Sequence, residues 1–144
     1  MKVLKFGGTS VGTVDSLRNV KSIVESEQEP VIVVVSALGG ITDQLINTAN
    51  LAAKHDPKYL ELYAGIVDRH NKVIAGIVPA ERQLDVHSIV DPLLEELGNL
   101  YRGINLLGDL SDRAMDIVVS YGERMSCVIV SRIINDATLL DSRN

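Results

Sequence analysis

The sequence has one cysteine, one phenylalanine and no tryptophan among its 144 residues. The single cysteine, Cys127, excludes a disulfide within the chain and is typical of a protein from a reducing compartment. Aromatic residues make up 3% of the chain and hydrophobic residues 46%, so a core has to be built from aliphatic side chains. This composition predicts a folded domain rather than a disordered chain.

Long apolar runs and an excess of positive charge are also missing. The longest uninterrupted apolar run is Val31–Val35, which is far too short to span a bilayer, and no signal-peptide pattern is evident. The net charge of −5 disfavours binding to nucleic acid or to an anionic membrane. We therefore expect a cytoplasmic protein without a nucleic-acid or membrane partner, in which any anionic substrate is held by a lysine, by backbone N–H groups or by a metal.

The order of the first segments predicts an α/β fold. Lys2–Phe6 has the composition of a short strand, and apolar residues then recur at helical spacing after a helix start at Thr13 or Asp15. Val31–Val35 follows as five apolar residues without polar alternation, which is typical of a strand that is buried on both faces of a parallel sheet. Strand, helix and strand in this order predict a βαβ unit.

The rest of the chain is predicted to be mainly helical. Thr42 is expected to cap a helix that runs to about Lys54, and Ser111 a short helix that ends near Tyr121. The other expected segments are helices over 60–74, 79–104 and 125–133 and a third strand over 137–141. Three strands are few for a parallel sheet, so the pattern indicates part of a larger α/β domain.

The first candidate site is the run Lys5-Phe6-Gly7-Gly8-Thr9-Ser10 at the end of the first strand. In open α/β sheets, ligands bind beyond the carboxyl ends of the strands, and paired glycines let the backbone N–H groups approach an anion. A glycine turn beside a surface lysine explains the same pattern equally well. The run matches neither a Walker A loop nor the G-x-G-x-x-G fingerprint.

Two further runs contain polar residues next to glycine. Ser36 and Thr42 flank a glycine-rich turn after the second strand, where they offer hydroxyl groups to a ligand, although a turn with a helix cap is the simpler reading for Thr42. Glu123 lies within the run Ser120–Ser126. Its carboxylate could bind a substrate ammonium group or, as a first-turn residue, complement a helix dipole. His55, His70 and His87 are spaced too widely for a helical metal pair.

Taken together, KFGGTS at 5–10, VVSALGGIT at 34–42 and SYGERMS at 120–126 resemble the aspartate kinases of the amino-acid kinase family, including the bifunctional aspartokinase–homoserine dehydrogenases. The resemblance covers the whole chain and implies a three-layer αβα fold with a mainly parallel open sheet. Residues 1–144 would be the N-terminal part of the catalytic domain, because the later aspartate-binding and adenine-binding segments of the family pattern are absent. More distant family members have His-Gly-Gly where this chain has Ser-Ala.

The resemblance implies ATP-dependent phosphorylation of the side-chain carboxylate of L-aspartate, with Mg²⁺, in a homo-oligomer that serves lysine, threonine and methionine biosynthesis. By the same resemblance, Lys5 is catalytic and neutralises the transferring phosphoryl group. The residues that would bind phosphate are Lys5, Gly7, Gly8, Thr9 and Ser10, and those that would bind aspartate are Ser36, Thr42 and Glu123. No metal ligand is assigned in this chain. The alternative is a non-catalytic half-domain that serves as an oligomerisation or binding module.

Overall fold

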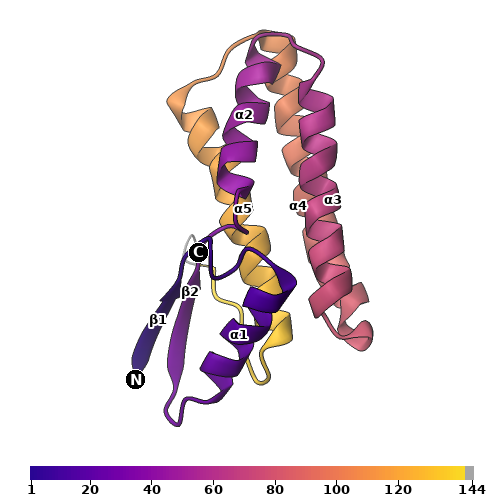
Figure 1. The fold of residues 1–144 in the computed structure, drawn as a ribbon. Helices are drawn as coiled ribbons and strands as arrows, with labels where there is room; N and C mark the ends of the chain where they lie inside the picture. The colour runs from indigo at the N-terminus through magenta and orange to yellow at the C-terminus, as the bar shows by residue number, and fades with distance from the viewer. Residues whose placement is uncertain (142–144) are drawn as a thin grey trace.

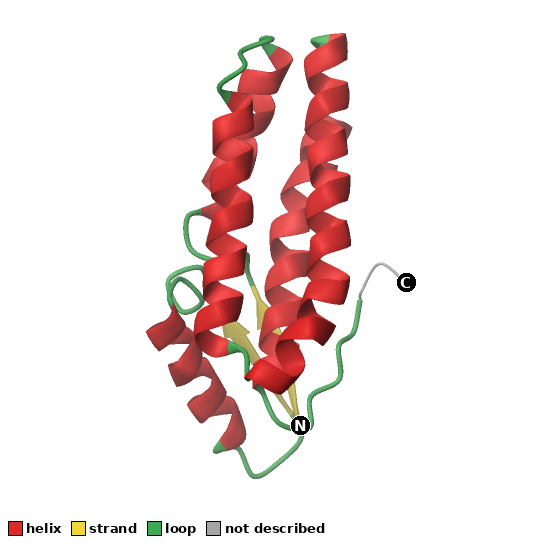
Figure 2. Ribbon diagram, turned by 90° about the vertical axis from the view of Figure 1, so that its right-hand side faces the viewer, coloured by secondary structure: helices red, strands yellow, loops and turns green. Residues whose placement is uncertain are grey.

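The computed structural model describes residues 1–141. Its elements, in chain order, are β1 (Lys2–Phe6), α1 (Val14–Glu25), β2 (Val31–Val35), α2 (Ile41–Ala53), α3 (Tyr59–Ile77), α4 (Ala80–Leu107) and α5 (Asp112–Ile133). The four long helices α2 to α5 form an elongated bundle that extends well past the carboxyl ends of the strands (Figure 1). The two strands and α1 lie at one end of this bundle, as the view turned by 90° also shows (Figure 2).

The first three elements form the predicted βαβ unit. β1 and β2 pair in parallel, in a register that runs from Lys2 opposite Val31 to Phe6 opposite Val35. Thr13 is the N-cap of α1, and its hydroxyl accepts a hydrogen bond from the Ser16 backbone N–H at 3.1 Å. The Ser16 hydroxyl in turn accepts from the Thr13 N–H at 2.9 Å, which completes a capping box. The predicted parallel pairing and the Thr13 cap are confirmed.

The two-stranded sheet is covered on only one face within the described residues. The side chains on the covered face are Leu4, Phe6, Val31, Val33 and Val35. On the other face Val3, Ile32 and Val34 are 65%, 43% and 44% exposed. The prediction that the second strand is buried on both faces is therefore wrong for residues 1–141. Side chains alternate between the faces of a strand, and the helices described here pack against one of them.

Helix α5 corrects a second prediction. It runs without a break through Tyr121 and Gly122, where the sequence suggested one helix ending and another starting. A glycine weakens a helix interior by only about 1 kcal/mol, and tertiary packing can offset that cost. Gly122 is buried against α2 and the turn before it. Glu123 therefore lies in the middle of a helix, and the alternative role as a first-turn residue is excluded.

Two further predictions fail near chain turns. Residues 137–141 form no strand, and Leu139 packs instead against the core as part of an irregular segment. Helix α2 is not capped by Thr42. It begins at Ile41 after Gly40, whose φ of +83° lies in the left-handed region that favours glycine.

The core is aliphatic, as the composition predicts, with a few polar groups inside it. Tyr101 of α4 is fully buried, and its hydroxyl donates to the Leu45 carbonyl of α2 at 3.0 Å. His70 of α3 is also fully buried, with Nδ1 at 2.7 Å from the Ile66 carbonyl. Over residues 1–141, no helix combines the length and the apolar character needed to cross a membrane.

Candidate active site

The first glycine turn folds tightly over Gly7 at the end of β1. The backbone N–H groups of Ser10 and Val11 donate to the Gly7 carbonyl at 3.0 and 3.3 Å. A Cβ added to Gly7 would meet no atom within 4 Å, so the space beside this backbone is open. A turn with free space beside a glycine can let an anion approach its backbone N–H groups. Thr9 on the same turn is exposed, and Ser10 is half-buried.

The second turn, Ser36–Gly40, packs directly against the first. The Ser36 N–H donates to the Phe6 carbonyl at 3.1 Å, which extends the pairing of the two strands by one bond. A Cβ added to Gly8 would lie 3.7 Å from the Ser36 hydroxyl. A Cβ added to Gly39 would lie 2.8 Å from the Gly8 carbonyl oxygen, which is closer than side chains pack. The two predicted turns therefore share one edge of the sheet, and this contact requires glycine at position 39.

The third motif reaches the second turn through Gly122 of α5. A Cβ added to Gly122 would lie 2.8 Å from the Ala37 Cβ and 3.0 Å from Leu45 Cδ1. Helix α5 consequently approaches the second turn and α2 more closely than it could if position 122 carried a side chain. The next residue, Glu123, is exposed on α5 beside this contact. All three motifs singled out from the sequence thus meet in one region.

The carboxylates of Glu123 and Asp141 lie near the thiol of Cys127 on α5. The pKa of the Cys127 thiol is raised, first because the thiol is partly buried and then because the carboxylates of Glu123 and Asp141 lie near it. Cys127 is thereby kept protonated and unreactive at neutral pH.

Lys5 and Thr42 lie at the borders of this region. Lys5 is on β1 opposite Val34, and its exposed side chain belongs to the uncovered face of the sheet. Thr42 is exposed in the first turn of α2. Within residues 1–141, no hydrogen bond or ion pair engages the side chains of Lys5, Thr42 or Glu123. Their polar groups are free to contact a ligand, but the structure does not join these three side chains to one another.

Arg69 of α3 is a residue that the motifs did not reveal. Its guanidinium donates a hydrogen bond to the Gly12 carbonyl, which fixes the end of the first glycine turn to the helical bundle. A Cβ added to Gly12 would lie 3.2 Å from the Gly8 carbonyl oxygen, so Gly12 also belongs to the glycine contact. The separation of 57 positions between Gly12 and Arg69 in the sequence explains why local spacing could not indicate this contact.

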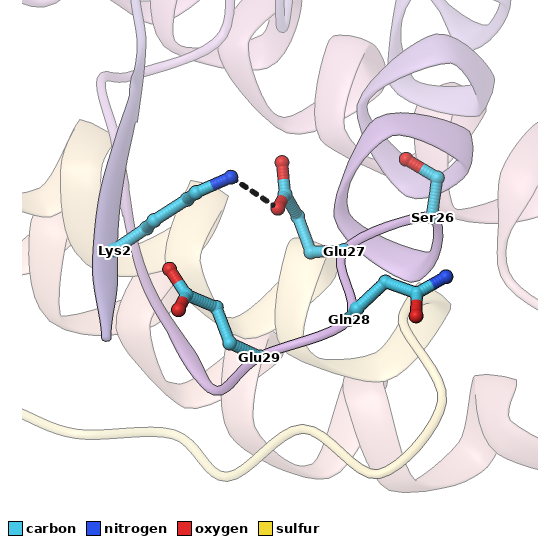
Figure 3. Close-up of a pocket in the computed structure, with 5 residues that line it drawn as sticks. All are labelled: Lys2, Ser26, Glu27, Gln28 and Glu29. Carbon is cyan, nitrogen blue, oxygen red and sulfur yellow. Dashed lines mark hydrogen bonds and ion pairs between the residues drawn. The ribbon is translucent and has the colours of Figure 1, made fainter.

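A separate hollow of about 310 Å³ lies at the opposite end of the strands, lined by Lys2, Ser26, Glu27, Gln28 and Glu29 (Figure 3). Its one positive group, Lys2 Nζ, is already paired with Glu27 Oε2 at 2.9 Å. Ligands of open α/β sheets bind beyond the carboxyl ends of the strands, whereas this hollow adjoins the start of β1. We assign no ligand to it.

Comparison with known proteins adds to this picture. The profile described as "Amino acid kinase family" matches residues 1–141. Aspartokinase 1, chloroplastic, of Arabidopsis thaliana is 30% identical over 92% of the chain, which spans 23% of that relative. The bifunctional aspartokinase/homoserine dehydrogenase 1, chloroplastic, of Zea mays is 32% identical over 90% of the chain, which spans 14% of it. The chain therefore spans less than a quarter of the length of these relatives.

Solved structures give the same result for the fold. A crystal structure of Escherichia coli aspartokinase III in complex with aspartate and ADP matches 92% of the chain with a TM-score of 0.80 and 29% identity. The chain covers 28% of that protein. Clostridium acetobutylicum aspartate kinase, at 22% identity, matches 99% of the chain with a TM-score of 0.74. The predicted α/β fold of the amino-acid kinase type is confirmed, and the chain contains part of it.

Proposed function

The chain belongs to the amino acid kinase family, and on that basis we propose that it supplies the aspartate side of a kinase site that phosphorylates the side-chain carboxylate of L-aspartate. The observation that supports the proposal is the close contact of Gly122, the residue before Glu123, with Ala37 of the second glycine turn. The relative Escherichia coli aspartokinase III was solved with aspartate and ADP, which supports the same ligands here. The product would be aspartyl phosphate, at the head of lysine, threonine and methionine biosynthesis.

In the proposed complex, the carboxylate of Glu123 pairs with the aspartate ammonium group, and Thr42 donates a hydrogen bond to one of the aspartate carboxylates. The Ser36 hydroxyl, which donates to the Ala37 carbonyl at 3.0 Å, would have to turn away from it to donate to the aspartate. The exposed position of Glu123 supports this assignment. Charge-assisted hydrogen bonds of this kind are roughly twice as strong as neutral ones. The two hydroxyl groups would orient the side-chain carboxylate toward the first glycine turn.

The first turn is assigned to the phosphate side. The open space beside Gly7 lets phosphate oxygens approach its backbone, and Gly8, Thr9 and Ser10 would add N–H and hydroxyl donors. Lys5 would neutralise the charge on the transferring phosphoryl group. An oxygen of the aspartate side chain bonds to the γ-phosphorus while the bond from that phosphorus to the bridging oxygen of ADP breaks. The nucleophile is already a carboxylate, so alignment and charge stabilisation suffice.

The described residues offer no protein cage for the Mg²⁺ that accompanies ATP. No group of three His, Cys, Asp or Glu side chains gathers within residues 1–141 in a way that could hold a metal ion. Mg²⁺ in kinases is held by substrate phosphates and water together with one or two carboxylates. We propose that the nucleotide phosphates carry the Mg²⁺, and we assign no residue of this chain to it.

Isothermal titration calorimetry with L-aspartate tests the proposal on residues 1–144. We expect weak binding that Glu123→Gln reduces at least ten-fold, because the substitution removes the charge but keeps the shape. Glu95→Gln on α4 is the matched control, since Glu95 is also an exposed helical carboxylate. Equal affinities for all three proteins would contradict the assignment of Glu123. With ATP, Mg²⁺ and aspartate, we expect no turnover from these residues by themselves, because no adenine-binding segment is recognised in them.

The uncovered sheet face favours a second role, self-association. Val3, Ile32 and Val34 present an apolar surface on a two-stranded sheet whose outer edges have no partner strand within residues 1–141. Such faces and edges promote pairing with another chain. We expect sedimentation velocity to detect dimers or larger species, and the double substitution Ile32→Thr and Val34→Thr to reduce them. A monomer at all concentrations would refute this role without affecting the aspartate assignment.

A further inference from the structure

Gly12 lies against the first glycine turn and faces its carbonyl oxygens. A Cβ added to Gly12 would lie 3.2 Å from the Gly8 oxygen and 3.6 Å from the Thr9 oxygen. On the other side of the same contact, a Cβ added to Gly39 would lie 2.8 Å from the Gly8 oxygen. No peptide bond in residues 1–141 is cis. The Thr9 N–H, which is opposite the Gly8 oxygen in one peptide plane, therefore points away from Gly12.

The N–H groups on the outer side of this turn are free. Within residues 1–141, no hydrogen bond engages the backbone N–H of Gly8 or of Thr9. Thr9 is exposed, so a ligand can reach its N–H from solvent. Successive free N–H groups in a turn form a site that attracts anions. Any anion affinity of this turn consequently depends on keeping the N–H groups outward and the carbonyl oxygens inward.

The peptide group that joins Gly12 to Thr13 is fixed at both ends. Its oxygen accepts a hydrogen bond from the Arg69 guanidinium, and its N–H donates to the Ser16 hydroxyl at 2.9 Å. The bond to Ser16 is local, whereas the bond from Arg69 comes from another helix. In the part of the chain that the structure describes, Arg69 is the only donor to the Gly12 oxygen. Without it, the wide backbone freedom of glycine would let this peptide group turn.

Arg69 extends from a part of α3 that is fixed against the start of α1. Gly76 lies seven positions further along the same face of α3, and a Cβ there would lie 2.7 Å from Val14 Cγ2. Val73, between the two, is 4% exposed. No carboxylate forms an ion pair with Arg69 in residues 1–141. Its full charge therefore strengthens the hydrogen bond to the Gly12 oxygen.

We propose that Arg69 is a positioning residue for the phosphate side of the kinase site. By binding the Gly12 carbonyl, it keeps Gly12 against the Gly8 oxygen and thereby keeps the Thr9 N–H directed outward at the phosphate. Arg69 acts through Gly12 and does not contact the phosphate. The inference rests on the proposed assignment of the first turn to phosphate, and it adds a residue of α3 that determines the affinity of that turn.

The test measures the binding of inorganic triphosphate, which has the phosphate chain of ATP, to the 144-residue chain by ¹⁵N–¹H correlation spectra. We expect Arg69→Met to weaken binding about ten-fold, the effect of losing a hydrogen bond from a charged donor. The Thr9 amide should show the largest loss of shift change. Lys72→Met is the matched control, because Lys72 is an exposed cation on the same helix. Its removal should change the affinity by less than about two-fold.

Gly12→Ala separates positioning from a direct effect of the Arg69 charge. The added methyl group meets the Gly8 oxygen, so this variant should also weaken binding while the charge of Arg69 stays in place. If Arg69 acts through Gly12, the double variant should bind about as weakly as the weaker single variant. Fully additive losses would overturn the positioning role. If Arg69→Met does not fold, Gly12→Ala tests the same link, and unchanged triphosphate binding in it would overturn the inference.

Failure of this inference can be told apart from failure of the proposed function. If the parent chain binds triphosphate at residues 7–10 and Arg69→Met binds it equally well, Arg69 is not a positioning residue and the phosphate assignment stands. If the folded parent shows no shift change at residues 7–10 with millimolar triphosphate, the phosphate assignment is contradicted, and the role of Arg69 with it.

Discussion

Replacing Gly122 with alanine tests the contact on which the candidate site depends. The added methyl group would lie 2.8 Å from the Ala37 Cβ and 3.0 Å from Leu45 Cδ1. Ala37 has no flexible side chain that could move aside, so α5 or the second turn has to shift. Overpacking of this kind costs about 1–3 kcal/mol. Alanine is the better helix former by about 0.5–1 kcal/mol, so we expect a net loss of about 1–2 kcal/mol in the free energy of unfolding.

Urea denaturation followed by circular dichroism measures this loss. The midpoint should fall while the slope with denaturant stays constant, and Tm should drop by about 4–8 °C. Gly65→Ala on α3 is the matched control, because a Cβ there meets no atom within 4 Å. This control should stabilise the protein by about 0.5–1 kcal/mol. The two glycine-to-alanine changes are thus expected to have opposite signs.

A double variant separates the contact from general effects on the helix. Ala37→Gly removes the methyl group that the new side chain would meet, so Gly122→Ala should cost less in that background. The expected coupling between the two substitutions is about 1 kcal/mol, within the range for residues in contact. If Gly122→Ala stabilised the protein as Gly65→Ala does, and showed no coupling to Ala37→Gly, the close approach of α5 to the second turn would be refuted.

Substitutions at three other residues test other parts of the structure and of the proposed site. Burial lowers the pKa of His70, so the free energy of unfolding should decrease as the pH falls below about 6.5. Urea titrations of His70→Leu should show a weaker dependence of this free energy on pH, and an equally steep dependence in the variant would contradict the role of His70. Arg69→Met should speed amide hydrogen exchange around Gly12, whereas exchange unchanged from the parent would remove Arg69 as an anchor of that turn. Within a complete kinase that contains this segment, Lys5→Ala should lower kcat about 100-fold with little change in KM, and near-normal turnover would remove Lys5 from the site.

The local elements of the fold could be predicted from the sequence because their signals are local. Glycine after the first strand, a helix start at Thr13, and the apolar run Val31–Val35 predicted the βαβ unit and its parallel pairing. Gly122 led to a wrong prediction because its role depends on a residue that is distant in sequence. A glycine within apolar helical segments looks like a helix end, and only the distant Ala37 explains why it occurs inside α5.

The predictions of a third strand over 137–141 and of burial on both faces of the second strand were wrong, because both features depend on partners that are distant in sequence. Ala137–Asp141 has strand-like composition, but β-structure depends on a partner strand, and in residues 1–141 none lies beside this segment. Val31–Val35 has enough apolar side chains for burial on both faces, while the helices present cover one. The anchoring of Gly12 by Arg69 depends on a contact across 57 residues, which no spacing rule contains.

The most direct test of the proposed function is to map L-aspartate on the chain by ¹⁵N–¹H correlation spectra during a titration. We expect saturating shift changes in three places that are distant in sequence, namely residues 7–10, residues 36–42 and the turn of α5 around Glu123. The same titration with Glu123→Gln should need at least ten-fold more aspartate. Shift changes confined to other surfaces, or the absence of any change at millimolar aspartate in a folded protein, would contradict the assignment of these three motifs to one substrate site.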